Sequence, residues 1–148
     1  MLGCITRDYE GSPVTGKCWY GDFSLPCNAS ETYVSRCSDP SDPDPKQLFD
    51  FVPVSHDEVL IQAHNEDRCF HRVQRNVTLE TCDATSHRQR WIAARGGFNE
   101  QRFELSQKRV SKWCLNQDHH PKYGERVRMY ECEKIRHESH QTSWFNLY

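Results

Sequence analysis

Long apolar runs are missing from this sequence. Only 36% of its 148 residues are hydrophobic and the mean hydropathy is -0.89. No stretch approaches the roughly 20 apolar residues that a membrane-spanning helix needs. Residues 1–10 also lack the apolar core of a signal peptide. The sequence therefore predicts no membrane insertion. If the protein is secreted, its signal peptide has been removed and Met1 is not native.

An excess of charge of one sign is also missing. The chain has 19 basic and 21 acidic residues, a formal net charge of -2, and the two signs are interspersed. Nucleic-acid-binding domains present a basic face, and proteins held at anionic membrane surfaces carry polybasic patches. We therefore predict neither a nucleic-acid partner nor a membrane-surface partner.

Catalytic and metal-binding patterns are absent as well. The chain contains no nucleophile elbow, no His-Glu-x-x-His sequence and no C-x-x-C pair. Its histidine clusters, His119-His120 and His137 to His140, fall in predicted loops and are interpreted as solvated side chains. The sequence thus predicts that the protein is not an enzyme and that it has neither a metal site nor a cofactor.

Cysteine, by contrast, is abundant, with eight residues in a short polar chain. Such a chain buries a modest core, and each disulfide adds about 2–4 kcal/mol of stability. Disulfides persist in oxidising compartments, so we predict a secreted or extracellular protein. The alternative is a cytosolic protein with reduced thiols.

Two tripeptides fit the acceptor sequence for N-glycosylation. They are Asn28-Ala29-Ser30 and Asn76-Val77-Thr78. Such tripeptides also occur by chance, but both agree with secretion. We therefore predict glycosylation at Asn28 and Asn76, with Asn76 in a polar turn.

Three segments of the chain follow one order. A cysteine and an apolar residue lead into a short alternating strand that ends in a second cysteine. After a polar loop, a Gln precedes an aromatic residue by two or three positions. The second cysteines are Cys37, Cys82 and Cys132, at steps of 45 and 50 residues. One domain, 1–148, is expected, with repeats at roughly 13–54, 55–99 and 100–148 and an N-terminal extension at 1–12.

The repeats predict an all-β fold. Val77 and Leu79 alternate with polar residues, and so do Val127 and Met129, which is typical of half-buried strands. A short strand pair cannot bury its apolar face alone, whereas three pairs packed around a pseudo-threefold axis can. The recurring aromatics would form the core of that arrangement. These aromatics are Phe49, Trp91 and Trp144.

The third repeat, from Cys114-Leu115-Asn116 to Gln141-Thr-Ser-Trp144, resembles the ricin B-type β-trefoil lectin family. The second and third repeats together are also similar to the cysteine-rich domain of the mannose-receptor family. The resemblance implies a single β-trefoil domain of three Cys–strand–Cys–QxW-like repeats, stapled by disulfides.

Equivalent positions in the repeats predict the disulfide pairing, which the number of cysteines alone leaves open among 105 possibilities. Each repeat joins its own two cysteines, and the two left over, Cys4 and Cys27, pair by exclusion. The expected bridges are Cys18–Cys37, Cys69–Cys82, Cys114–Cys132 and Cys4–Cys27.

The resemblance also implies a shallow sugar site in the third repeat. In the family, an acidic residue stands two positions after the first cysteine. Asn116 holds that position here, and Asp118 lies two positions further on. Arg128 holds a position where the family often has Gln. Tyr130 takes the place of the aromatic on which the sugar ring stacks. The candidate ligand-binding residues are Asn116, Asp118, Arg128, Tyr130, His140 and Gln141.

These residues favour a glycan or glycoprotein ligand. An Arg and a His in the site would suit a sulfated or otherwise acidic glycan. The other repeats depart from the motif, with His71 and Glu80 in the second and Tyr20 and Ser35 in the first. The leading prediction is a lectin-like module that uses its third repeat. The alternatives are a structural or protein–protein interaction trefoil in an extracellular assembly and, more remotely, a protease inhibitor.

Overall fold

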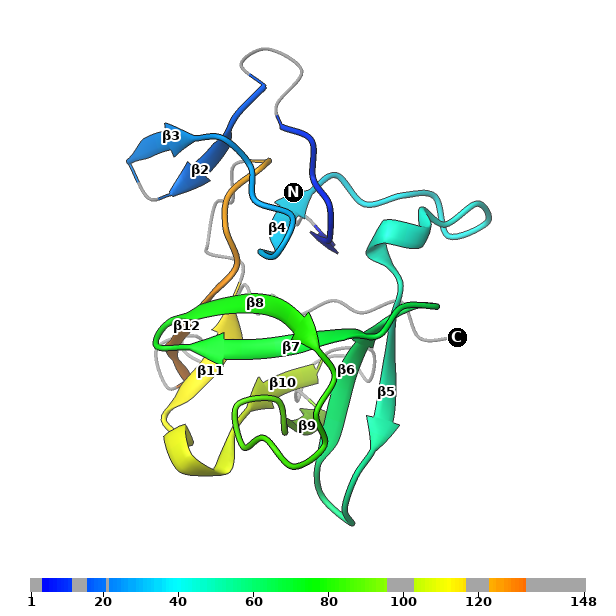
Figure 1. Ribbon diagram of the computed structural model, residues 1–148, viewed down its shortest axis with the longest axis vertical. Helices are drawn as coiled ribbons and strands as arrows, with labels where there is room; N and C mark the ends of the chain where they lie inside the picture. The colour runs from blue at the N-terminus through cyan, green and yellow to red at the C-terminus, as the bar shows by residue number, and fades with distance from the viewer. Residues whose placement is uncertain (1–3, 12–15, 21, 96–102, 117–122, 133–148) are drawn as a thin grey trace.

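The computed structural model describes residues 4–11, 16–20, 22–95, 103–116 and 123–132, and it is built of strands (Figure 1). The all-β class is confirmed. The strands are β1 (Cys4–Thr6), β2 (Cys18–Tyr20), β3 (Phe23–Leu25), β4 (Tyr33–Ser35), β5 (Phe49–Pro53), β6 (Val59–Ala63), β7 (Arg68–Val73), β8 (Asn76–Thr81), β9 (Ile92–Arg95), β10 (Phe103–Ser106), β11 (Trp113–Asn116) and β12 (Arg128–Glu131). Two 3-10 turns are η1 (Pro45–Gln47) and η2 (Lys108–Val110).

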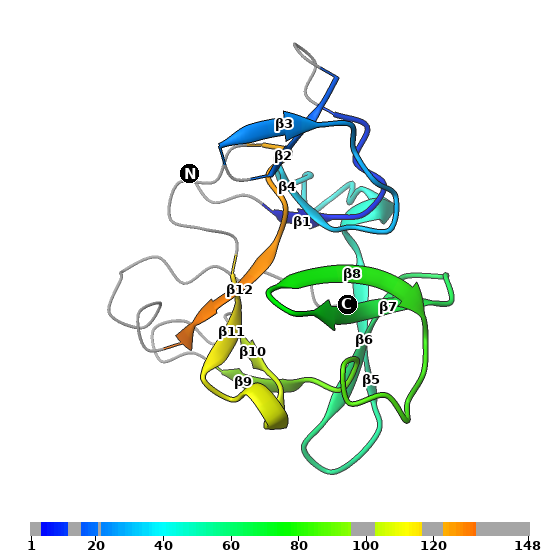
Figure 2. The same ribbon diagram turned by 60° about the vertical axis from the view of Figure 1, so that its left-hand side comes forward.

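The strands form one large sheet and two small ones. The eight-stranded sheet has the order β5-β6-β7-β8-β12-β11-β10-β9, and β1–β4 and β2–β3 are two-stranded. Most neighbours in the large sheet are also neighbours in sequence, so it is a succession of antiparallel hairpins. Figures 1 and 2 show this sheet curling on itself, with the β2–β3 hairpin at one end of the molecule.

Three hairpins share one register: β1–β4, β7–β8 and β11–β12, here called the first, second and third hairpins. In each, the first cysteine faces the residue two positions before the second cysteine. The next pair inward is apolar and at most 2% exposed. These buried pairs are Ile5 with Val34, Phe70 with Leu79, and Leu115 with Met129. The predicted bridges Cys69–Cys82 and Cys114–Cys132 are confirmed.

The other two predicted bridges, Cys18–Cys37 and Cys4–Cys27, are wrong. The structure joins Cys4 to Cys37 and Cys18 to Cys27. The physical reason is the register of the first hairpin, where Cys4 lies opposite Ser35, two positions before Cys37. Residues 4–6 therefore belong to the first hairpin and are not part of an extension.

The three hairpins are joined to one another in a closed cycle. Each link has the same form. The donor is the backbone amide of the residue three positions before the second cysteine of one hairpin. The acceptor is the backbone carbonyl of the residue seven positions before the second cysteine of another hairpin. The links are Met129 N to Arg75 O at 2.6 Å, Leu79 N to Ser30 O at 2.5 Å, and Val34 N to Glu125 O at 2.8 Å. The hydrogen bonds thus run from the third hairpin to the second, from the second to the first, and from the first to the third.

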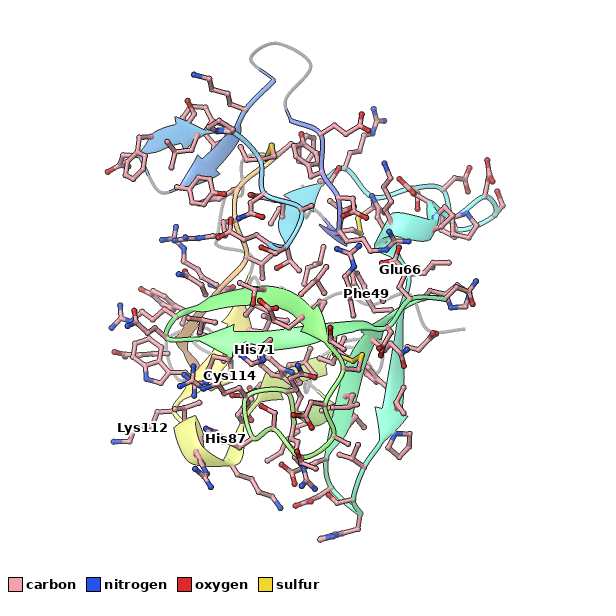
Figure 3. The ribbon with its side chains drawn as sticks, viewed as in Figure 1. Phe49, Glu66, His71, His87, Lys112 and Cys114 are labelled. Atoms are coloured by element: carbon pink, nitrogen blue, oxygen red, sulfur yellow. A yellow bond between two sulfur atoms is a disulfide. The ribbon has the colours of Figure 1, made fainter. Side chains whose placement is uncertain are left out.

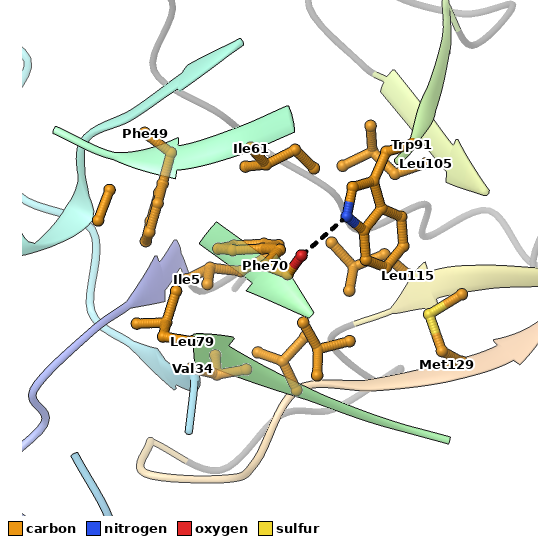
Figure 4. Packing of buried hydrophobic residues seen from close by; sticks show 13 residues of the cluster. Ile5, Val34, Phe49, Ile61, Phe70, Leu79, Trp91, Leu105, Leu115 and Met129 are labelled. Carbon is orange, nitrogen blue, oxygen red and sulfur yellow. Dashed lines mark hydrogen bonds between the residues drawn. The ribbon is translucent and has the colours of Figure 1, made fainter. Parts of the chain in front are cut away.

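The hairpins and the neighbouring strands enclose a common apolar core (Figure 4). The predicted core residues Phe49 and Trp91 are 5% and 0% exposed. Phe70 lies between them: its ring meets that of Phe49 edge-on at 4.9 Å, and its carbonyl accepts a 3.2 Å hydrogen bond from Trp91 Nε1. Trp144 lies outside the described residues.

In the first and second repeats, the Gln that precedes the aromatic residue stabilises the backbone around the second cysteine. Gln47 Oε1 accepts from the amide of Ser38, and its Nε2 donates to the carbonyl of Arg36. Gln89 makes the same two bonds, with the amide of Asp83 and the carbonyl of Thr81. Each buried Gln therefore replaces backbone partners on both sides of a second cysteine and ties that cysteine to the strand that follows.

A long segment, residues 7–32, is inserted between the two strands of the first hairpin. The second hairpin has a two-residue turn at this place, Gln74-Arg75. The insertion contains β2–β3 and the Cys18–Cys27 bridge. It packs on the chain before β12, because Trp19 N donates to Gly124 O at 2.7 Å and Arg126 N donates to Trp19 O at 3.1 Å.

Candidate functional site

A cavity of about 330 Å³ opens where the third hairpin meets the tip of the second. Three of the predicted ligand-binding residues, Asn116, Arg128 and Tyr130, line it. The predicted residues Asp118, His140 and Gln141 lie outside the described residues. The remaining lining residues were not predicted: they are Arg75, Asn76, Arg126 and Met129.

Strand geometry brings the predicted residues together. Asn116 on β11 faces Arg128 on β12, and Tyr130 follows Arg128 by two positions. Because side chains on a strand alternate between faces, Arg128 and Tyr130 lie on one face, while Met129 points into the core. Asn76 pairs with Arg128 across the junction with β8 and brings the tip of the second hairpin into the wall.

Three guanidinium groups give the cavity its charge. Arg75 lies 4.3 Å above the ring of Trp113, and Arg126 lies 4.9 Å from the ring of Tyr20. These aromatic faces stabilise the cations and fix their positions. No carboxylate is among the described residues that line the cavity. The arrangement suits an anionic group, which arginine binds through several N–H donors.

Two of the arginines also have acidic neighbours, neither of which lines the cavity. Arg128 Nη2 is 3.2 Å from Glu125, and Arg126 Nη1 is 4.0 Å from Glu31. Arg126 Nε is buried without a hydrogen-bond partner in the described part of the chain. The carboxylates therefore orient the guanidinium groups of Arg126 and Arg128.

Tyr130 forms the apolar part of the site. It is 40% exposed, although it lies on a strand whose neighbouring residue, Met129, is 1% exposed. An accessible aromatic beside polar groups matches the surface of a sugar, which has an apolar C–H face and a rim of hydroxyl groups.

The equivalent position in the first hairpin is closed. Tyr33, four positions before Cys37 as Arg128 is before Cys132, is fully buried, and its hydroxyl donates to Glu31 at 3.0 Å. Tyr20 from the insertion packs against it and hydrogen-bonds to Glu31 and Tyr33. Burial, followed by these contacts with Glu31 and Tyr33, strongly raises the pKa of Tyr20. The phenols therefore stay neutral and hold the inserted hairpin in place.

The second hairpin presents different chemistry at this position. His71 takes the place of Asn116 and Glu80 that of Tyr130, as the sequence indicates. Burial, and to a lesser extent Arg88 and Arg72, lower the pKa of His71 despite the opposing effect of Glu80. Beside this position, the neighbouring first hairpin contributes Ser30 and Glu31. In the cavity of the third hairpin, the equivalent residues are Arg75 and Asn76 of the second hairpin.

The two glycosylation sequons differ in their surroundings. Asn28 is exposed, and its Oδ1 accepts from both the amide and the hydroxyl of Ser30 at 2.9 and 2.8 Å. The prediction of a turn at Asn76 is wrong: the turn is Gln74-Arg75, and Asn76 pairs with Val73 as the first residue of β8 and lines the cavity. Glycosylation at either position stays a prediction.

One acidic side chain, Glu104, lies near two cysteines in a group with metal-ligand spacing, but Cys114 and Cys132 are joined in a disulfide. Within the described residues, no helix is long and apolar enough to span a membrane. No protein-family model, curated protein or solved structure matches the chain.

Proposed function

We propose that this protein is an extracellular carbohydrate-binding module with a β-trefoil fold, and that it binds a glycan with a negatively charged group. The site is the cavity between the second and third hairpins. The observation that carries the proposal is the joint presence of three guanidinium groups and the 40% exposed Tyr130 around one cavity.

The cyclic links between the three hairpins support the trefoil. Each hairpin has the same register, the same bridge and the same buried apolar pair, and each is bonded to the next by an equivalent amide. The common bonds of Gln47 and Gln89 add a further equivalence. Four disulfides in a chain of this size agree with an extracellular location.

The cavity offers a separate partner for each part of such a ligand. A sulfate or carboxylate group accepts hydrogen bonds from Arg75, Arg126 and Arg128, which are charge-assisted and therefore stronger than neutral ones. The apolar face of the sugar ring stacks on Tyr130. The amides of Asn76 and Asn116 can donate to and accept from hydroxyl groups at the rim.

A protein-interaction module is the second candidate. One observation favours it: Phe23 and Leu25 on the inserted hairpin are 61% and 46% exposed. An exposed apolar strand is a common element of protein interfaces. This surface lies on β3, outside the cavity, so the two functions can be tested separately.

A glycan array with neutral, sulfated and carboxylated sugars tests the proposal, followed by calorimetry with the best ligand and its uncharged counterpart. We expect Arg128→Ala to weaken binding at least about tenfold and Tyr130→Ala about three- to tenfold. Arg36→Ala and Phe23→Ala are matched controls, since both residues are exposed and neither lines the cavity. Failure of every charged glycan to bind the folded protein would overturn the proposal.

A further inference from the structure

The positive charge of the cavity continues beyond it along the surface. Next to Arg75 on the surface lies Arg72. Its Nη1 donates to the carbonyl of Gln74 at the tip of the second hairpin. Arg72 N donates in turn to Arg88 O at 2.9 Å. Arg88 is adjacent to His87, which lines a second cavity of about 230 Å³ together with Arg109. We call Arg75, Arg72, Arg88, His87 and Arg109 the basic band.

A buried amide holds the middle of the basic band in place. Gln107 is 1% exposed; its Oε1 accepts from Arg72 Nε at 2.8 Å, and its Nε2 donates to Arg88 O at 2.7 Å. Gln107 also immediately precedes η2, which carries Arg109. One side chain therefore orders three segments that are far apart in sequence. Figure 3 shows His71 and His87 in the half of the molecule away from the β2–β3 hairpin.

The basic band lacks the ion pairs that neutralise other cations of the protein. Arg7 and Arg68 share Asp8 and Glu66 in a four-residue network. At the second cavity, Lys108 and Arg90 pair with Glu58. Within the described ranges, no ion pair to a carboxylate involves a residue of the basic band. Like charges held together without counter-charges cost free energy unless an anion neutralises them.

The titration of His87 reflects this concentration of charge. Burial first, and then the positive charges of Arg109, Arg88, Arg72 and His71, lower the pKa of His87. Two acidic groups lie beside the basic band: Glu80, whose charge opposes the lowering of the His71 pKa, and Glu58, which lines the second cavity.

We propose that the ligand is a linear anionic polysaccharide, one unit of which occupies the cavity at Tyr130 while the chain continues along the basic band to the second cavity. This inference rests on the proposed function, because it takes the sugar in the cavity as one end of the chain. A chain with an anionic group on each unit fits this surface, because guanidinium groups recur along its length and a single ring stacks at one end.

Heparin-derived oligosaccharides of two and twelve units test the inference by calorimetry. The dodecasaccharide is expected to bind about tenfold more tightly than the disaccharide, because exposed ion pairs each add a small increment. In the double variant Arg88→Ala/Arg109→Ala this advantage should disappear, while disaccharide affinity stays unchanged. Removal of the two contacts should also lower the salt dependence of dodecasaccharide affinity, by about one logarithmic unit of slope for each contact.

The charge-matched control is Arg36→Ala/Lys46→Ala, which removes two cations outside both cavities. Equal losses in the two double variants, or equal affinities for the two oligosaccharides, would overturn the inference and leave the cavity proposal intact. Absence of binding by the disaccharide and by every charged glycan of the array would instead overturn the proposed function. A single-stranded DNA of twelve nucleotides is the competing polyanion, and tighter binding of this DNA than of the dodecasaccharide would overturn the polysaccharide assignment.

Discussion

The first and third hairpins have the same framework and opposite surfaces. Both have a cysteine bridge in the same register and a buried apolar pair beneath it. At the position four before the second cysteine, however, Tyr33 is buried under the inserted hairpin and Arg128 lines an open cavity. The difference shows that a few positions suffice to maintain the hairpin, and that the remaining positions are available for binding.

The largest expected effect is on the free energy of unfolding, and it distinguishes the Cys4–Cys37 bridge from the Cys18–Cys27 bridge. Cys4–Cys37 closes a loop of 33 residues and belongs to the common framework, whereas Cys18–Cys27 closes a loop of 9 residues within the insertion. Replacing both cysteines by serine should lower the free energy of unfolding by about 3.7 kcal/mol for the former and about 2.6 kcal/mol for the latter, because the longer loop gains more entropy. Guanidinium denaturation measures both values. A larger loss for the Cys18–Cys27 variant would contradict the framework role of Cys4–Cys37.

Substitution of Gly124 tests how the inserted segment covers the position of Tyr33 in the first hairpin. Its φ is +88°, and a Cβ there would lie 2.8 Å from the ring of Tyr9. Gly124→Ala should therefore destabilise the protein by about 2–3 kcal/mol, from backbone strain together with displacement of Tyr9. Gly16, with a φ of +66° and no atom within 4 Å of a Cβ, is the matched control.

For Gly16→Ala, backbone strain alone should lower the free energy of unfolding by about 1 kcal/mol in thermal or denaturant unfolding. Because Arg126 follows Gly124 by two residues, Gly124→Ala should also weaken glycan binding in the cavity, and Gly16→Ala should not. Equal effects of the two substitutions on stability would show that the contact with Tyr9 contributes nothing.

The smallest expected effect is a pH dependence at the basic band. The lowered pKa of His87 leaves its imidazole neutral at pH 7, and protonation as the pH falls adds a positive charge. Dodecasaccharide affinity should therefore rise about two- to threefold between pH 7 and pH 5, and the rise should be smaller in His87→Ala. Exposed His56 lines neither cavity and is the control position. Its substitution by alanine should preserve the pH profile. A profile unchanged by His87→Ala would exclude His87 from the contact.

The sequence predicts those features that depend on local order. Two bridges, the alternation of Val77 with Leu79 and the burial of Phe49 and Trp91 follow from patterns within one repeat. The pairing of Cys4 could not be predicted in this way, because the insertion separates it from Cys37 and supplies a competing cysteine before an apolar residue, Cys18.

Two of the four missed site residues share one physical cause. Arg75 and Asn76 come from the hairpin that neighbours the third one in the cycle, so no spacing within the third repeat indicates them. The sequence does not indicate the basic band for a similar reason. Its cations are interspersed with acidic residues in sequence, and only the fold, through Gln107, gathers Arg72 and Arg88 on one surface.

The most direct test of the contrast between the hairpins is an NMR titration of the protein with the heparin disaccharide. We expect the backbone amide signals of Asn116, Arg128 and Tyr130 to shift in a saturable manner, and those of Tyr33 and Ser35 in the first hairpin to stay unchanged. Shifts confined to the first hairpin, or equal shifts in both, would contradict the claim that the third hairpin alone of these two presents an open site.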